Sequence, residues 1–225
     1  MNMTDNPGPF VIKDCALAAI ATGVRAQNLR ELADRLQTIH PGSIYYHFWG
    51  GLLRPHFDDP EYNNDFAAWI RHALHDIELA ERLGVIDPAD YTDLEALRQD
   101  LLEVLEQHLD ATDSHSWAER DNQFHFLRSQ IVVFDTQRTI QQPEDLVQVI
   151  PTLSVGSIFY HFIDARSRAP HSVDDFRVWL SRFDGRYTDV CVALAAVDPY
   201  FVSLIELREN LTAIFRRYLG GARPA

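Results

Sequence analysis

Cysteine, lysine and long apolar runs are all scarce in this sequence. The only cysteines, Cys15 and Cys191, predict reduced and at least half-buried thiols, as in a cytoplasmic protein. Lysine is nearly absent although arginine is common, a bias typical of GC-rich genomes from which we infer no function. No apolar run approaches the roughly 20 residues needed to cross a bilayer. Residues 1–9 lack the basic and then apolar layout of a signal peptide. We therefore expect a cytoplasmic protein without a membrane span.

Positive charge is also scarce. The formal net charge is −13 at pH 7. Non-specific nucleic-acid binding depends on Lys and Arg side chains that neutralise phosphates, and an anionic membrane surface attracts the same side chains. The charge therefore predicts neither nucleic acid nor membrane as a partner. The binding partners that remain are a small molecule or another protein.

A seven-residue stretch, Gly42–Phe48, returns 114 positions later as Gly156–Phe162. The two stretches read Gly-Ser-Ile-Tyr-Tyr-His-Phe and Gly-Ser-Ile-Phe-Tyr-His-Phe, and matching residues continue on both sides of them. A period of this size indicates repeated structural units. We expect two tandem copies of one module, over residues 10–109 and 124–219, with a polar linker over 110–123.

The opening segment of each copy predicts a strand. Residues 124–134 are rich in aromatic and β-branched side chains, which favours a strand. The matching residues 11–21 are rich in alanine and by themselves look helical. Because copies of one module share a backbone, we expect strands in both, paired with each other. The predicted fold is mainly α with minor β (α+β): two homologous helical modules, each led by a short strand and packed as one pseudo-two-fold body.

Helix signals follow each strand. Asn28 and Glu31 have the spacing of a capping box. Ser43 and Ser157 directly precede the aromatic residues of the repeated motif and are predicted to cap its helix. Apolar residues from Phe66 to Leu83 recur at helical spacing, which predicts one long helix after Asn64.

Tyr46-His47 and its counterpart Tyr160-His161 form the first candidate site. Duplicated aromatic and imidazole groups could line a cavity between the two copies, and a histidine can bind a metal or respond to pH. The alternative is that these histidines are hydrogen-bonded core residues.

Two further candidate sites are less specific. His72, His75 and Asp76 have helical spacing and could hold a divalent metal, although a solvated polar face gives the same pattern. Arg54 and Arg168 recur at matching places and could clamp a carboxylate or phosphate.

Arg98 and Arg208 also match each other in the two copies. For all four arginines the favoured expectation is a structural ion pair within the fold, with Asp87 and Asp198 as the natural partners, and clamping of a ligand is the alternative.

The motifs Ser-Ile-Tyr-Tyr-His (43–47), Asn-Asp-Phe-Ala-x-Trp (64–69) and Leu-x-x-Leu-Arg (94–98) resemble a bacterial family catalogued only as a domain of unknown function. The second copy departs from this pattern with Phe159 for the first tyrosine and Asp174 for the asparagine. The resemblance covers most of the chain and implies no activity.

The leading hypothesis is a non-catalytic protein that binds a small ligand or a partner protein at the interface of the repeats. We predict no catalytic residues and no cofactor. The alternative is a metal-dependent, hydrolase-like enzyme that uses the duplicated histidines and a divalent metal. The sequence does not determine the oligomeric state.

Overall fold

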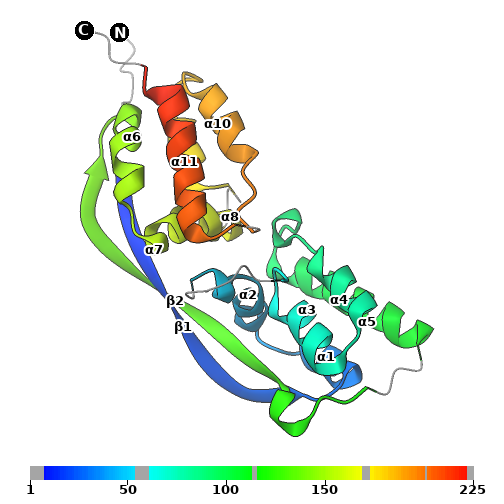
Figure 1. Cartoon of the computed structure of the whole chain (residues 1–225). Helices are drawn as coiled ribbons and strands as arrows, with labels where there is room; N and C mark the ends of the chain where they lie inside the picture. The colour runs from blue at the N-terminus through cyan, green and yellow to red at the C-terminus, as the bar shows by residue number, and fades with distance from the viewer. Residues whose placement is uncertain (1–7, 54–60, 113–115, 169–172, 201, 222–225) are drawn as a thin grey trace. The chain divides into compact units, whose positions relative to one another are not determined.

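A computed structural model describes residues 8–53, 61–112, 116–168, 173–200 and 202–221 (Figure 1). These residues form helices and one two-stranded sheet. The predicted class, mainly α with minor β, is confirmed. None of the described helices is long and apolar enough to cross a membrane.

The sheet pairs strand β1 (Phe10–Ala26) with strand β2 (Phe124–Ile140), and the two run antiparallel (Figure 1). Thr22 Oγ1 donates to the carbonyl of Phe126, and Thr136 Oγ1 donates to the carbonyl of Ile12. The alanine-rich segment 11–21 is therefore a strand, as we predicted from its match to residues 124–134. Each strand has 17 residues, so the expectation of short strands is wrong.

The chain divides into two compact units, and this division explains the length of the strands. Unit 1 contains Met1–Ala16 and Val132–Ala225, and unit 2 contains Leu17–Ile131. The boundary falls in the middle of both strands, so each strand contributes one half to each unit. The modules predicted over 10–109 and 124–219 stay a prediction.

Unit 2 contains the helices of the first half of the chain. They are α1 (Leu29–Leu36), α2 (Pro41–Trp49), α3 (Asp65–Trp69), a π-helical turn (Ile70–Leu74), α4 (Ile77–Gly84) and α5 (Leu94–Ala111), with short 3-10 turns at Gly50–Leu53, Pro88–Asp90 and Arg120–Asn122.

Unit 1 contains the helices of the second half. They are α6 (Leu146–Val149), α7 (Val155–Ile158), a π-helical turn (Phe159–Asp164), α8 (Ala165–Ser167), α9 (Asp175–Leu180), α10 (Thr188–Ala195) and α11 (Leu204–Leu219), with 3-10 turns at Pro143–Asp145 and Ile150–Thr152.

The predicted start of α1 is confirmed, but the predicted serine caps are wrong. Asn28 accepts from the N–H of Glu31, and the Glu31 carboxylate accepts from the N–H of residue 27. Helix α2 begins at Pro41 with His40 as its cap, two residues before Ser43. In unit 1 the cap of α7 is Ser154, which accepts from the N–H of Ser157. Each helix therefore starts before the serine that the motif contains.

The single long helix expected after Asn64 is also wrong. The helical backbone ends at Leu74, and His75 takes a left-handed conformation with φ 59°. Asp76 then caps the new helix α4 by accepting from the N–H of Leu79. Ile77, which continues the apolar spacing beyond the break, is 55% exposed, whereas Leu79, Ala80 and Leu83 of α4 are buried, so the apolar pattern is not one buried face.

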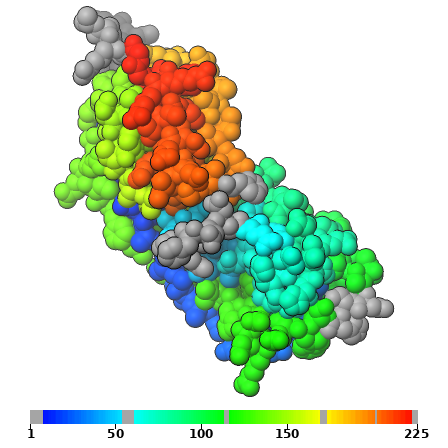
Figure 2. Space-filling model, viewed as in Figure 1, coloured from blue at the N-terminus to red at the C-terminus, as the bar shows by residue number. Residues whose placement is uncertain are grey.

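The longest helix of each unit provides much of its core. Leu97, Leu101 and Leu105 of α5 are buried, as are Leu207, Leu211 and Phe215 of α11. Figure 2 shows the outward side of α11, coloured orange to red, at the surface of unit 1. Burial of each large apolar side chain contributes about 1.5–3 kcal/mol, so these stripes hold the helices in place.

Candidate functional site

His161 connects helix and strand in unit 1. The backbone N–H of Lys13 donates to its Nε2 at 2.9 Å, and its Nδ1 lies 2.7 Å from Oδ2 of Asp175. A ring nitrogen that accepts a hydrogen bond carries no proton. The single proton of the neutral ring is therefore on Nδ1, which donates to the carboxylate. His161 is 2% exposed and both of its ring nitrogens are in use. The ring is a neutral link between strand β1 and helix α9.

His47 makes the same connections in unit 2. The backbone N–H of Leu127 donates to its Nε2 at 3.2 Å, and its Nδ1 lies 2.8 Å from Oδ2 of Asp65. The ring is 4% exposed and packs against Phe124 at 4.7 Å. The two histidines predicted as site residues therefore both hold a strand of the sheet against a helix.

The glycine of the repeated motif lets the helix approach the strand closely. A Cβ at Gly156 would collide with Oδ1 of Asp14 and the carbonyl oxygen of Cys15. The Cys15 thiol donates to the Gly156 carbonyl at 3.3 Å, and Ser129 Oγ donates to the Gly42 carbonyl at 3.1 Å. Burial, together with nearby carboxylates, raises the pKa of the Cys15 thiol to about 12. These contacts make Cys15 a packing residue.

Arg168 closes the network around His161. Its guanidinium lies 2.9 Å from Asp175 Oδ2 and 3.1 Å from Asp164 Oδ2. It also donates to the hydroxyl and the carbonyl of Tyr160, and stacks over the Tyr160 ring at 4.1 Å. Burial alone would raise the pKa of Asp175, but the hydrogen bond from His161 and the charge of Arg168 hold it below its usual value. The predicted arginine is thus committed to acids of its own unit.

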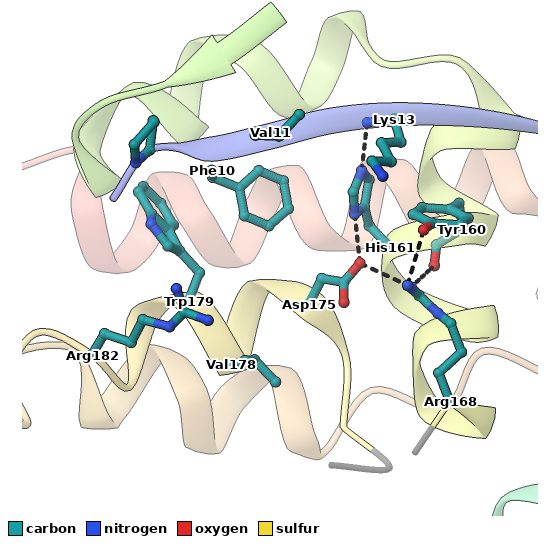
Figure 3. A pocket seen from close by; sticks show the side chains of 11 residues that line it. Phe10, Val11, Lys13, Tyr160, His161, Arg168, Asp175, Val178, Trp179 and Arg182 are labelled. Carbon is teal, nitrogen blue, oxygen red and sulfur yellow. Dashed lines mark hydrogen bonds and ion pairs between the residues drawn. The ribbon is translucent and has the colours of Figure 1, made fainter. Parts of the chain in front are cut away.

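A surface pocket of about 270 Å³ lies beside this network (Figure 3). Phe10, Val11, Val178 and Trp179 form its apolar wall. The Trp179 indole donates to a backbone carbonyl of residue 8 at 2.9 Å, which fixes the ring. The polar part of the lining comes from Lys13, Tyr160, His161, Arg168, Asp175 and Arg182. This volume is just below the range of about 300–1,000 Å³ that is usual for small-molecule sites.

The comparisons with known proteins bear on the whole chain. The sequence pattern of a family described as "Family of unknown function (DUF5752)" matches residues 7–216. The chain belongs to this family. A solved structure, described as the structure of OrfY from Thermoproteus tenax, is similar to this DUF5752 chain. It has 29% sequence identity and a TM-score of 0.82, over 94% of this chain and 95% of that chain. Comparison with curated proteins found no match.

Three of the residues predicted as ligand-binding in this DUF5752 chain line the pocket. Tyr160, His161 and Arg168 lie together in unit 1, whereas Tyr46 and His47 belong to unit 2 and are buried there. Arg54 lies outside the described residues.

The predicted metal ligands of the DUF5752 chain do not converge. Asp76 pairs with the buried His108 at 2.7 Å, and the exposed His72 lies 3.2 Å from Glu61. His75 ends the π-helical turn, so the helical spacing that brought the three residues together is broken. In the part of the chain that the structure describes, no group of three or more His, Cys, Asp or Glu side chains could hold a metal ion. A divalent metal stays a prediction.

The paired arginines of the DUF5752 chain hold backbone carbonyls. Arg98 donates to the carbonyl of Leu36 and forms a 2.8 Å ion pair with Glu95. The predicted partner was Asp87. Arg208 donates to the carbonyl of Leu153 at 2.9 Å. Both arginines therefore satisfy carbonyls where an earlier helical segment ends.

Among the pocket residues that sequence reasoning missed in the DUF5752 chain are two cations, Lys13 and Arg182. When the two halves of the sequence are aligned on their matching motifs, Leu127 matches Lys13 and His72 matches Arg182, so both positions differ between the halves. Lys13 is also the single lysine of the chain. A search for shared residues cannot find positions at which the copies differ.

Proposed function

We propose that this chain is a non-catalytic binding protein whose small-ligand site is the pocket of unit 1. The observation that carries the proposal is the lining of this pocket. Cationic side chains and aromatic rings surround about 270 Å³ of open space, held by the rigid network of His161, Asp175 and Arg168. A concave surface with an apolar wall and a few fixed polar groups is the usual form of a ligand site. The cytoplasmic location that the proposal includes rests on the sequence.

The proposal includes a tandem duplication of one module, over residues 10–109 and 124–219 with a linker at 110–123. Recurring contacts at matched positions support it. The bonds from the Lys13 amide to His161 and from the Leu127 amide to His47 are equivalent, and Trp69 and Trp179 donate to carbonyls 114 positions apart. Under this proposal the histidine framework is common to both copies, and the pocket's two cations are Lys13 of the first copy and Arg182 of the second.

The alternative of a metal-dependent hydrolase has less support. A histidine can ligate a metal only through a nitrogen with a free lone pair. In His161 and His47 one nitrogen accepts from a backbone amide and the other donates to a carboxylate. Metal binding at either ring would require the strand to release its hydrogen bond.

Native mass spectrometry of the protein as purified tests the binding function. We expect a small molecule that is lost on denaturation and is absent from Val178→Trp, in which the indole fills the pocket. Ala68→Trp is the matched control, because Ala68 is the half-buried counterpart of Val178 in unit 2. Circular dichroism establishes that both variants are folded. A ligand retained by folded Val178→Trp would exclude this pocket, and a bare chain would redirect the search to a partner protein.

A further inference from the structure

Two cations of the pocket have no partner within the part of the chain that the structure describes. Neither the Lys13 ammonium nor the Arg182 guanidinium makes an ion pair or hydrogen bond with a described residue, although both line the pocket. Arg168, by contrast, is neutralised by Asp164 and Asp175. The pocket therefore carries two exposed cations that no described acid neutralises. Their charge attracts an anion into the pocket.

The two free cations lie apart in the pocket. Figure 3 shows Lys13 and Arg182 towards opposite ends, with Phe10, Val178 and the Asp175 carboxylate in the region between them. Asp175 is neutralised by its ion pair with Arg168. His161 does not compete for an anion, because both of its nitrogens are engaged. A ligand that satisfies both cations must therefore carry its charges apart, and an apolar segment between them can pack against Phe10 and Val178.

The corresponding place in unit 2 lacks this arrangement. Leu127 replaces Lys13 and His72 replaces Arg182, and His72 already lies 3.2 Å from Glu61. The shared framework of histidine, carboxylate and tryptophan is present in both units, so it does not select the ligand. The residues that distinguish unit 1 are the two cations.

Resting on the proposed function, we infer that the pocket of unit 1 binds one small organic dianion per chain. The ligand is elongated, with a carboxylate or phosphate group at each end and an apolar middle. One end pairs with the Lys13 ammonium and the other with the Arg182 guanidinium, which can accept a planar carboxylate or a phosphate through two parallel hydrogen bonds. The middle lies against Phe10 and Val178.

Isothermal titration calorimetry with defined probes tests this inference. The probes are the linear dicarboxylates from succinate to sebacate, the monocarboxylates of the same lengths, and phosphonocarboxylates as the phosphate arm. We expect one site per chain, an affinity that passes through a maximum with chain length, and monocarboxylates that bind about tenfold more weakly. Preference between the carboxylate and phosphonate arms identifies the anionic group. Added salt weakens binding because the cations are exposed.

Variants that copy unit 2 locate the binding. Lys13→Leu and Arg182→His each lower dicarboxylate affinity about tenfold, to the level of the monocarboxylate, while Arg25→Leu on the exposed surface of unit 2 leaves it unchanged. Because Lys13 is the single lysine, reductive ¹³C-methylation gives one side-chain NMR signal, with the N-terminal amine as an internal reference. The dimethyl-lysine signal shifts on titration with the dicarboxylate and the N-terminal signal does not.

Each contrary outcome has a separate meaning. Equal binding of mono- and dicarboxylates, or unchanged affinity in Lys13→Leu and Arg182→His, overturns the dianion inference. If no probe binds but the purified protein carries a ligand that Val178→Trp loses, the ligand class is wrong and the proposed site stands. If folded Val178→Trp keeps that ligand, the proposed site itself is wrong.

Discussion

Replacement of His161 by alanine removes the link between strand β1 and helix α9. The lost bonds are the one from the Lys13 amide, about 1 kcal/mol, and the one to the Asp175 carboxylate, about 2 kcal/mol. The ring also leaves a cavity beside Phe10, whose ring centroid is 4.9 Å away, which adds about 1 kcal/mol. We expect a loss of about 4 kcal/mol in the free energy of unfolding, a large part of the usual total of about 5–15 kcal/mol.

His47→Ala is the matched variant in unit 2, and it should cost less. The amide of Leu127 lies farther from the ring, at 3.2 Å, and the side chain of Asp65 is 40% exposed against 29% for Asp175. Water can therefore replace more of the lost bonding. We expect about 3 kcal/mol. Urea denaturation followed by circular dichroism measures both variants.

Two further substitutions separate the bonds of His161. Gln can place an acceptor near the position of Nε2, whereas Asn can place a donor near the position of Nδ1. Amide hydrogen exchange should therefore show Lys13 protected in His161→Gln and exposed in His161→Asn, with the Leu127 amide unchanged in both. A Lys13 amide that stays protected in His161→Ala, or a cost below about 1 kcal/mol for that variant, would refute the structural role.

Three other predictions follow from the same contacts. The pKa of Asp175 is lower in the folded protein than its ordinary value of 3.8, so the folded state binds fewer protons. The stability that Asp175→Asn loses relative to the wild type is therefore largest above pH 3.8 and diminishes as the pH falls through the lower folded pKa. Parallel stability curves of wild type and variant across this pH range would disprove the prediction. Gly156→Ala should cost about 1–3 kcal/mol because its methyl group meets backbone, while Gly51→Ala, with open space around it, should be neutral; equal melting temperatures would contradict this. Gly23 and Gln137 both have positive φ, a conformation that glycine adopts more easily than other residues. Gly23→Ala should therefore lower the stability of the protein by about 1 kcal/mol, and Gln137→Gly should not lower it. Thermal melts of the two variants measure both effects.

The strands were predicted because two stretches of the sequence match each other. The aromatic and β-branched residues of 124–134 identified the alanine-rich segment 11–21 as a strand, against its own helical propensity. The length of the strands could not be read in this way, since it depends on each strand serving two compact units. The helix break at His75 was missed because apolar periodicity continues across it.

Part of the candidate site was predicted because its residues belong to the repeated sequence motif. Repetition drew attention to His47 and His161, whose common role is structural. Lys13 and Arg182 were not predicted as site residues, because the matched positions hold Leu127 and His72. Only the fold brings Lys13, near the start of the chain, to the same pocket as Arg182. Comparison of differences between copies, as well as identities, would have identified both.

His161 and His47 are neutral links whose two nitrogens are both occupied. ¹⁵N NMR of the imidazole rings measures this, because it distinguishes the protonated from the unprotonated nitrogen. At neutral pH we expect both rings as the tautomer with the proton on Nδ1 and a hydrogen-bonded, unprotonated Nε2. A ring with its proton on Nε2, or with either nitrogen bound to a metal, would contradict the account.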